Sequence, residues 1–371
     1  MITIKAPERY RAHPGALAEL GEEVARYGRH VLVITGANAS WHAVADELAR
    51  SLEAWHVAFT RAALAGYPSV AEVRALDARA ADEGADVIVG VGGGRALDAA
   101  KAVANECGLP IVTVPTVAAT CAAWAARSIL YTPEGTFDRI RWNRRGPVAV
   151  VADTDVLLAA PRRYLASGIL DTLAKWYEFA PLLADDVTSV SADYTVAISK
   201  AAFDLLQAHG RTVYGGGGTA AERQAVVDAV LFLAGTSGSA AGGAALRGFA
   251  HPVYFASTFY PAARRFLHGE KVAFGLAAQF VLQGRDDLLA HHLDDLAAYR
   301  AAYALDDWGV ASEATAQVAA ELAHRVYTGW PQVPAMPFVA SEEAVASAVR
   351  RADAAIRAHR APGDREEIDH G

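Results

Sequence analysis

The chain has 371 residues, which is more than one hydrophobic core usually accommodates, so two domains are expected. Hydrophobic residues make up 53% and charged residues 20%, a composition that argues against disorder, and the net charge of −8 disfavours nucleic acid or an anionic membrane as partner. The two cysteines exclude a disulfide scaffold or a cysteine-rich zinc site. No signal segment is visible and no apolar run reaches the roughly 20 residues that span a bilayer, so we expect a soluble cytoplasmic protein.

The first part of the chain alternates apolar runs typical of buried strands with helical patterns. In chain order the pattern predicts strand 30–36, helix 41–52, strand 56–59, helix 70–83, strand 86–94, helix 96–107, strand 110–116, hairpin 128–140 and strand 148–157. The hairpin is indicated by a Pro-Glu-Gly turn between strand-like flanks. Strands alternating with helices predict a parallel sheet whose ligand crevice lies at the carboxyl ends of the strands.

The pattern changes after Pro161 and becomes almost entirely helical up to residue 360, with breaks at Pro181, at glycines 215–218 and at 328–337. We therefore expect an α/β Rossmann-like parallel-sheet domain over 1–160 and an all-helical domain over 161–371. The last residues, from Ala361 on, have the composition of a frayed polar tail.

A glycine-rich turn, GVGGGRALDAAK at 90–101, lies where a predicted strand meets a helix. Glycines there permit positive φ and a close approach of the backbone to a pyrophosphate, and the helix N-terminus supplies amide donors. The alternative is a tight turn without a ligand, but three successive glycines at this place favour phosphate binding. The spacing is not G-x-G-x-x-G, so an ordinary Rossmann dehydrogenase is not indicated.

This turn, with Asp98 and Lys101, and the segment PTVAAT at 115–120 resemble the iron-containing alcohol dehydrogenase family in its glycerol-dehydrogenase-like branch. The resemblance implies a dehydroquinate synthase-like fold, a pyrophosphate on the glycine turn and a nicotinamide beside the second segment. It places the cofactor contacts at Gly93, Gly94, Arg95, Asp98, Thr116, Ala119, Thr120 and Tyr131.

The choice of nucleotide depends on the residues after the first predicted strand. A carboxylate there would hold the ribose hydroxyls and repel a 2′-phosphate. Ala37 and Asn38 stand where the glycerol dehydrogenases resembled have an aspartate. We therefore expect NADPH or NADH, with NADPH favoured.

Asp171, in GILDTLAKWYE, lies in the first predicted helix of the second domain, and His251 and His268 follow later in the chain. Each alone would more often be structural, but one carboxylate and two histidines suffice for a zinc or ferrous site with open positions. The segments GILDTLAKW and FLHGEKVAFG resemble the family's G-x-G-D-A-L and H-G-x-x-V-A-x-G motifs, and His251 stands where H-A-x-H-N-G usually begins. The resemblance implies that Asp171, His251 and His268 bind one divalent metal, zinc or Fe(II).

The sequence departs from the family around these ligands. Tyr254 stands where a second histidine usually lies near the transferred hydride, so Tyr254 or a water relay is left as the proton donor. Leu170 replaces the glycine before Asp171. Cys121 replaces an aspartate that helps to hold the polyol in glycerol dehydrogenases. A different substrate is therefore expected.

The segments PTVAATCAAW and DTLAKWYE are closer to the hydroxycarboxylate dehydrogenases of the same family, which reduce 2-oxo acids. Cys121, Trp124 and Arg127 are the predicted substrate-binding residues. A guanidinium at Arg127 can pair bidentately with a carboxylate or phosphonate, and a cofactor phosphate or a surface acid are its alternative partners. The alternatives for Trp124 and Cys121 are a core aromatic and a small apolar filler.

Together these features predict a metal-dependent NAD(P)(H) oxidoreductase that interconverts a small alcohol and carbonyl, with a 2-oxo acid or another anionic aldehyde or ketone as substrate. The alternatives are an NAD-dependent lyase of the dehydroquinate synthase type and a catalytically idle binding protein. Related enzymes usually associate, so a homo-oligomer is expected.

Overall fold

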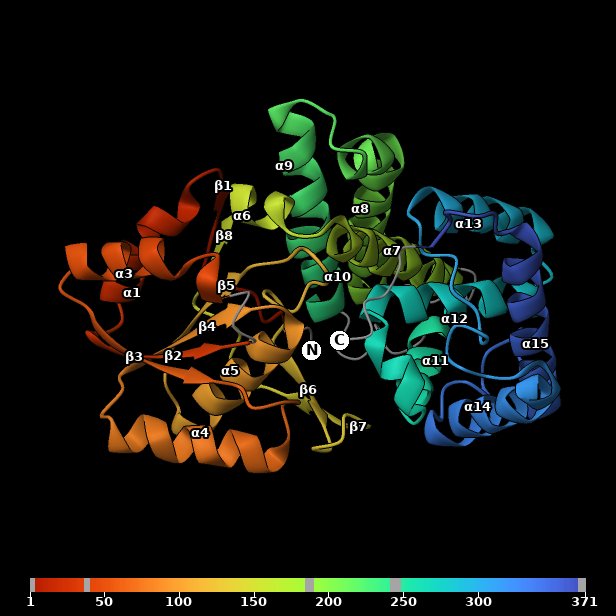
Figure 1. Ribbon diagram of the computed structural model, residues 1–371, viewed down its shortest axis with the longest axis horizontal. Coiled ribbons are helices and arrows are strands. Elements are labelled where there is room, and N and C mark those ends of the chain that lie inside the picture. Colours follow the sequence, from red (N-terminus) through yellow and green to blue (C-terminus); the bar gives the residue numbers. More distant parts are fainter. Residues whose placement is uncertain (1–3, 37–40, 184–189, 241–247, 366–371) are drawn as a thin grey trace.

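The computed structural model describes residues 4–36, 41–183, 190–240 and 248–365. Figure 1 shows a sheet with its helices on one side of the molecule and the helices of the second half of the chain on the other. This arrangement agrees with the expected fold class, a parallel-sheet half followed by a helical half. Among the described residues no helix is both long and apolar enough to cross a bilayer.

A six-stranded sheet forms the first half, in the order β1–β8–β5–β4–β2–β3, and all of its pairings are parallel. The strands are β1 (Arg9–His13), β2 (His30–Thr35), β3 (Ala58–Ala63), β4 (Val87–Gly92), β5 (Ile111–Pro115) and β8 (Ala149–Asp153). The strands β4, β5 and β8 are buried along their whole length, as is typical of a parallel sheet covered on both faces.

Helices cover both faces of the sheet because successive side chains of a strand point to opposite sides. Val31 and Val33 of β2 pack with η1 (Ala16–Glu19), α1 (Leu20–Ala25) and α3 (Ala45–Ala54). Leu32 and Ile34 of the same strand pack with α4 (Val70–Asp82) and α5 (Gly94–Cys107). Each face therefore has its own apolar layer.

Several predicted bounds shift by a few residues. The strand expected at 56–59 is β3, whose residues are mostly exposed or half-buried, so its pattern lacks a continuous apolar run. The strand expected at 148–157 ends earlier, at Asp153, because this carboxylate accepts a hydrogen bond from the amide of Asp155 (3.1 Å) and caps α6 (Thr154–Ala159). The hairpin is confirmed as the antiparallel pair β6 (Arg127–Tyr131) and β7 (Phe137–Trp142).

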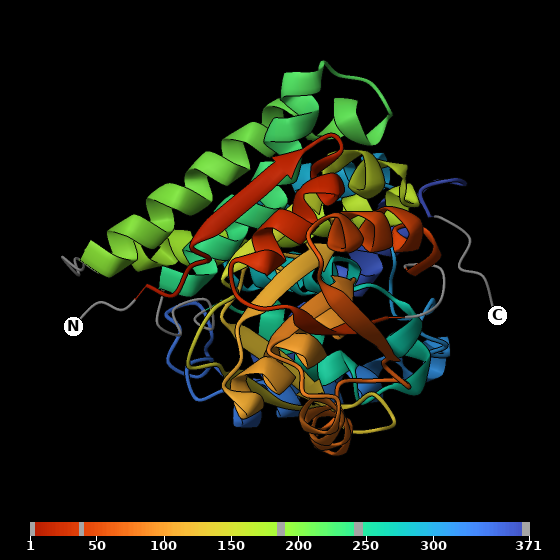
Figure 2. The same cartoon turned by 90° about the vertical axis from the view of Figure 1, so that its left-hand side faces the viewer.

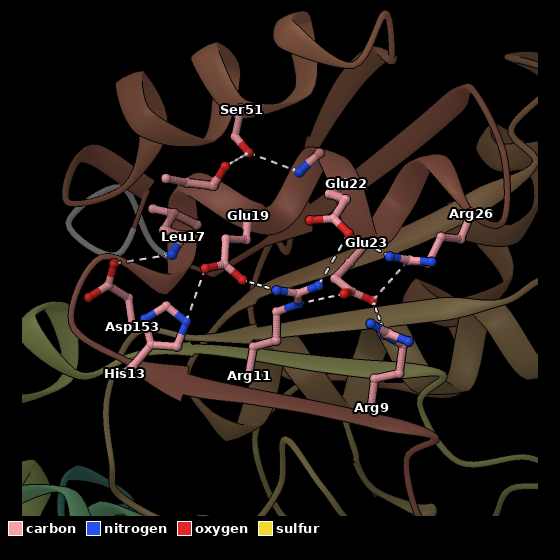
Figure 3. Close-up of polar contacts among 12 residues, drawn as sticks. Arg9, Arg11, His13, Leu17, Glu19, Glu22, Glu23, Arg26, Ser51 and Asp153 are labelled. Atoms are coloured by element: carbon pink, nitrogen blue, oxygen red, sulfur yellow. Dashed lines mark hydrogen bonds and ion pairs between the residues drawn. The ribbon is translucent and has the colours of Figure 1, made fainter.

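The edge strand β1 is missing from the sequence-based expectation. Its sequence RYRAH has no apolar run, and its arginines pair with acids of η1 and α1 (Figure 3). The carboxylate of Glu23 is fully buried and binds both Arg9 (2.7 Å) and Arg11. On its other face Tyr10 donates a hydrogen bond to Asp228 (2.7 Å), and Figure 2 shows β1, in red, beside the green helices of the second half. Ion pairs therefore hold a strand that hydrophobic periodicity does not mark.

We expect Glu23→Gln to lower the free energy of unfolding by about 2 kcal/mol, because two arginines lose a buried counter-charge. Urea unfolding measures this loss. The matched control is Glu22→Gln, whose side chain is 32% exposed and should lose less than about 0.5 kcal/mol. Equal losses in the two variants would contradict the role assigned to Glu23.

The second half of the chain is helical, as predicted. Its elements are α7 (Arg162–Phe179), η2 (Ala180–Leu183), α8 (Val190–Tyr214), α9 (Ala220–Asp228), the π-helical η3 (Ala229–Leu233), α10 (Ala234–Ala240), α11 (Ala250–Ser257), η5 (Pro261–Arg265), α12 (His268–Leu282), α13 (Asp286–Ala298), η6 (Ser312–Ala314), α14 (Thr315–Gly329) and α15 (Glu342–His359). The helix α12 is buried on all sides, because α7, α11 and α15 pack around it. It is the centre of this half.

The described part of the expected polar tail is attached to the fold. Arg365 forms an ion pair with Asp307 and a β-bridge with Ala301, and the carbonyl of Asp364 accepts a hydrogen bond from Ala302 (3.1 Å). The prediction of a frayed segment from Ala361 on is therefore wrong for 361–365. These contacts could not be predicted from the composition of the segment, because their partners lie more than fifty residues away in the chain.

Candidate active site

A cleft of about 670 Å³ lies between the carboxyl edge of the sheet and the helical half. Its walls come from the turn between β4 and α5, the segment after β5, β6 and the helices α7, α11 and α12. Its position is the one expected for a parallel sheet, outside the carboxyl ends of the strands. The predicted site residues that line it are Gly93, Gly94, Arg95, Asp98, Ala119, Thr120, Cys121, Arg127, Tyr131, Asp171, His251, Tyr254 and His268.

The glycine turn forms the sheet-side wall of the cleft. Gly92 has a φ of +138°, which L side chains rarely adopt, so a glycine is required there. Gly93 is the N-cap residue of α5. A Cβ on Gly93 would lie 3.2 Å from the side chain of Val117. Gly93 and Gly94 line the cleft, so the backbone of the turn faces it at the N-terminus of α5. Such a cradle of amides fits the pyrophosphate of a dinucleotide.

A buried ion pair in α5 holds the segment that lies beside this turn. The ammonium of Lys101 lies 2.9 Å from the carboxylate of Asp98. It also donates hydrogen bonds to the carbonyls of Ala122, Ala125 and Arg127 at 2.5–3.0 Å. Burial raises the pKa of Asp98 and lowers that of Lys101, because both charges leave water. Helix α5 therefore holds the segment that precedes β6 in place.

Asp171, His251 and His268 converge at the helical wall of the cleft, one from each of α7, α11 and α12. The Oδ1 atom of Asp171 lies 3.3 Å from the Nε2 atom of each histidine. Candidate ligand atoms of all three residues lie within 4.8 Å of one another. One carboxylate oxygen and two imidazole nitrogens at this spacing fit a zinc or ferrous ion with open coordination positions.

Two further residues of α7 support this cluster. Lys175 binds the Oδ2 atom of Asp171 (2.6 Å), and Glu178 accepts a hydrogen bond from the Nδ1 atom of His251 (2.5 Å). Burial alone would raise the pKa of Asp171, but Lys175 and the histidines hold it well below its usual value. Burial would lower the pKa of His251, but Glu178 and Asp171 raise it to about 9. A carboxylate behind a histidine ligand orients its second nitrogen toward the metal position.

Close helix packing brings these side chains together. A Cβ on Gly269, the second residue of α12, would lie 1.8 Å from the carbonyl oxygen of Ser167 in α7. The hydroxyl of Ser167 also accepts a hydrogen bond from the amide of Gly269 (3.0 Å). On its other side α7 touches the segment after β5, since a Cβ on Gly168 would lie 2.0 Å from the carbonyl oxygen of Ala118. Glycines therefore set the distance between Asp171 and the start of α12.

We expect Gly269→Ala to destabilise the fold by about 2 kcal/mol, because the added methyl group forces α7 and α12 apart. It should also weaken Zn²⁺ binding about 10-fold, because His268 moves away from Asp171. Thermal unfolding and a zinc titration by calorimetry measure the two effects. The control is Gly329→Ala at the end of α14, where a Cβ meets nothing within 4 Å and both quantities should stay unchanged. Unchanged zinc binding in Gly269→Ala would contradict this account.

Two tyrosines close the cleft from opposite halves of the molecule. The hydroxyls of Tyr131, in β6, and Tyr254, in α11, lie 2.5 Å apart. The ring of Tyr254 packs edge-on against the ring of His268, with 4.2 Å between the centroids. Burial raises the pKa of Tyr131 and raises that of Tyr254 to about 12, so both hydroxyls carry their protons at neutral pH. Tyr254 thus presents a protonated hydroxyl beside the cluster of Asp171, His251 and His268.

Thr116 and Trp124 lie outside the lining of the cleft. The ring of Trp124 packs in the core against Tyr10 (5.5 Å) and Phe232 (4.8 Å), so the core aromatic is the correct alternative and its expected place in the substrate pocket is wrong. The hydroxyl of Thr116 is buried without a hydrogen-bond partner in the described chain, and its expected contact with the cofactor stays a prediction. Arg127 does line the cleft, where its guanidinium donates to the carbonyl of Gly238 (3.1 Å).

Several residues of the site were not expected from the sequence. Lys175 and Glu178 follow Asp171 by four and seven residues, so helical periodicity was the available signal for their shared face. Lys271 follows His268 by one helical turn and lines the cleft. Tyr67 stacks under the guanidinium of Arg95 at 4.2 Å, and nothing in its local sequence marks it. Ala37 and Asn38, on which the expectation of NADPH rests, lie outside the described residues.

Known proteins similar to this chain share its fold and part of its sequence. A family model described as "Iron-containing alcohol dehydrogenase" matches residues 7–154. The glycerol dehydrogenase of Thermotoga maritima is 33% identical over 287 residues, which cover 74% of this chain and 76% of that protein. Hydroxycarboxylate dehydrogenase A of Escherichia coli is 37% identical over 230 residues, which cover 61% of this chain and 63% of that protein. The crystal structure of a probable glycerol dehydrogenase from Sinorhizobium meliloti has a TM-score of 0.85 and 25% identity, covering 96% of this chain and 100% of that chain.

The fold and these relatives define the class as metal-dependent alcohol and carbonyl oxidoreductases that use NAD(P). Within this class the chain belongs to the iron-containing alcohol dehydrogenase family. It is an NAD(P)-dependent alcohol dehydrogenase, the first of the functions that the sequence left open. The family implies a divalent metal, and the donor set of Asp171, His251 and His268 suits one.

Proposed function

We propose that this dehydrogenase interconverts a small anionic carbonyl compound and the corresponding alcohol. The preferred pair is a 2-oxo acid and its 2-hydroxy acid. The observation that carries the proposal is the charge of the cleft in a chain whose net charge is −8. Within the described part of the chain, acidic side chains in the lining are limited to Asp98 and Asp171. The basic side chains in the lining are Arg95, Lys101, Arg127, Arg163, Lys175, Arg264, Arg265 and Lys271. A basic cleft in an acidic protein attracts anionic ligands.

The substrate class is supported by two further points. The relative from Escherichia coli is named for hydroxycarboxylates, although the one from Thermotoga maritima is named for glycerol. Cys121 lies in the lining and is a small thiol that offers a polyol no carboxylate acceptor. A charged acid rather than a polyol is therefore the better match for this cleft.

In the proposed reaction the metal is held by Asp171, His251 and His268. When bound, the metal polarises the carbonyl group and NAD(P)H supplies the hydride. Lys175 keeps the carboxylate of Asp171 ionised, and Glu178 orients His251. Tyr254 donates the proton to the product oxygen, and its hydrogen bond to Tyr131 holds the hydroxyl in place.

The cofactor is proposed to bind on the glycine turn, with Gly93, Gly94 and Arg95 at its pyrophosphate. NADPH is the preferred nucleotide, since Ala37 and Asn38 offer no carboxylate to repel a 2′-phosphate. Zinc or Fe(II) is the proposed metal, because both accept two imidazoles and a carboxylate.

A substrate panel tests the proposal. The purified chain is loaded with Zn²⁺ or Fe²⁺ and given 2-oxo acids, neutral aldehydes or dihydroxyacetone, each with NADH and with NADPH. We expect stoichiometric oxidation of the nucleotide and the highest kcat/KM for a 2-oxo acid. Turnover without net consumption of NAD(P)H would instead indicate a lyase, and a preference for dihydroxyacetone would overturn the anionic substrate.

His268→Ala is expected to lose bound metal and to lower kcat about 1000-fold, because the loss of a Lewis acid costs several kcal/mol in the transition state. Metal analysis by mass spectrometry and NADPH oxidation measure both effects. The control is His291→Ala on α13, a histidine whose side chain is 46% exposed. If His268→Ala kept both its metal and its turnover, the assigned metal site would be wrong.

Tyr254→Phe is expected to retain metal and to lower kcat about 100-fold, because it removes the proposed proton donor. Tyr131→Phe keeps that donor and removes only its hydrogen-bond partner, so its loss should be smaller, about 10-fold. Steady-state rates with a 2-oxo acid measure both. If Tyr254→Phe kept the full rate, the proton donor would be a water relay and not Tyr254.

A further inference from the structure

Three lysines of the described chain are buried, and they differ in their partners. Lys101 pairs with Asp98 at 2.9 Å, and Lys175 pairs with Asp171 at 2.6 Å. Lys271 is 5% exposed, yet within the described ranges no carboxylate lies at ion-pair distance from its ammonium. The one hydrogen bond that it makes within the described chain, to the carbonyl of Ala263, is 3.3 Å long. A buried ammonium in this state leaves most of its hydrogen-bonding capacity unused.

The surroundings of Lys271 are cationic. The adjacent Glu270 is taken by Arg163, whose guanidinium binds both carboxylate oxygens at 2.6 and 2.7 Å. Burial, followed by the positive charge of Arg95, lowers the pKa of Lys271 to about 7, and Arg163 and Arg264 act in the same direction. An unpaired buried charge is unfavourable unless a counter-charge joins it. The missing counter-charge can come from a ligand in the cleft.

Lys271 stands close to the reacting end of the cleft. It lies three residues after His268, so the two side chains share one face of α12. Its ammonium lies 5.1 Å from the ring centroid of Tyr254, the ring that packs against His268. An anionic group on Lys271 would therefore bind beside the proposed proton donor and the proposed metal ligands.

Two arginines of the lining are bonded to protein atoms. Arg264 binds the carbonyls of Thr258 and Glu134 and the hydroxyl of Thr136, which ties η5 to the β6–β7 turn. Arg127, the anchor expected from the sequence, donates to the carbonyl of Gly238. Among the three buried lysines of the described chain, Lys271 is the ammonium with the fewest protein partners.

From these contacts we infer that Lys271 is the specificity-determining residue of the cleft and that its ammonium pairs with the carboxylate or phosphonate of the substrate. This inference rests on the proposed function, and it replaces Arg127 as the anion anchor. A phosphate of the cofactor has the same chemistry and is the competing partner. The two sources are distinguished by which affinity falls when the ammonium is removed.

The test compares Lys271→Met and Lys271→Arg with the unaltered enzyme, all loaded with metal, on pyruvate and on its neutral ester methyl pyruvate. We expect Lys271→Met to lower kcat/KM for pyruvate about 10- to 100-fold, mainly through KM, and to leave methyl pyruvate unchanged. Lys271→Arg should restore most of the preference for the acid. Lys200→Met, which removes an exposed lysine of α8, is the matched control and should change neither substrate.

Stability provides a second readout. Replacing an unpaired buried ammonium by methionine should raise the Tm of the ligand-free protein, whereas loss of a structural lysine would lower it. If Lys271→Met does not fold, Lys271→Gln keeps the side chain polar and takes its place in the same comparison.

Equal losses on pyruvate and methyl pyruvate would overturn the inference, as would a fall in NADPH or NADH affinity with the substrate preference intact. The second result would assign Lys271 to a cofactor phosphate. The proposed function fails separately, if the unaltered enzyme reduces none of the carbonyl compounds. An enzyme that reduces methyl pyruvate and shows no preference for pyruvate keeps its dehydrogenase activity and loses only the anion site.

Discussion

The arrangement of the active-site helices depends on the contacts of one group, the carboxylate of Asp171. One oxygen faces His251 and His268 from two other helices, and the second oxygen is held by Lys175 from its own helix. These groups lie together because a glycine at the start of α12 allows α7 to approach within backbone contact. A buried carboxylate with a partner on each side stays ionised, and that charge suits a metal cation.

The cleft shows how a largely acidic chain can present a basic surface to its ligands. Lys101 and Lys175 have carboxylate partners, so each buried pair is close to neutral and serves to position backbone or ligand atoms. Lys271 has no such partner in the described chain, and its side chain lines the cleft. In the proposed anion site, recognition falls to Lys271 and positioning to Lys101 and Lys175, because Lys271 lacks a carboxylate within reach in the described chain.

Much of the fold could be predicted from the sequence, because strands covered on both faces read as continuous apolar runs and surface helices read as amphipathic periods. The edge strand β1 could not, since its arginines are satisfied by Glu23 rather than by a core. Trp124 shows the same limit for a site residue: an aromatic after a nucleotide-binding segment can line a pocket or fill a core. Its packing against Tyr10 and Phe232 decides for the core.

By itself, the sequence determined the parallel sheet, the glycine turn at the end of one strand and the residue types able to bind a metal, because these features depend on local pattern and side-chain chemistry. Only the tertiary structure decided that Asp171, His251 and His268 lie within 4.8 Å of one another, and that Glu178 rather than a solvent molecule backs His251. It alone decided that Lys271 has no counter-charge among the described residues. Periodicity records which face of an element is buried, whereas a counter-charge is supplied by an element from elsewhere in the chain.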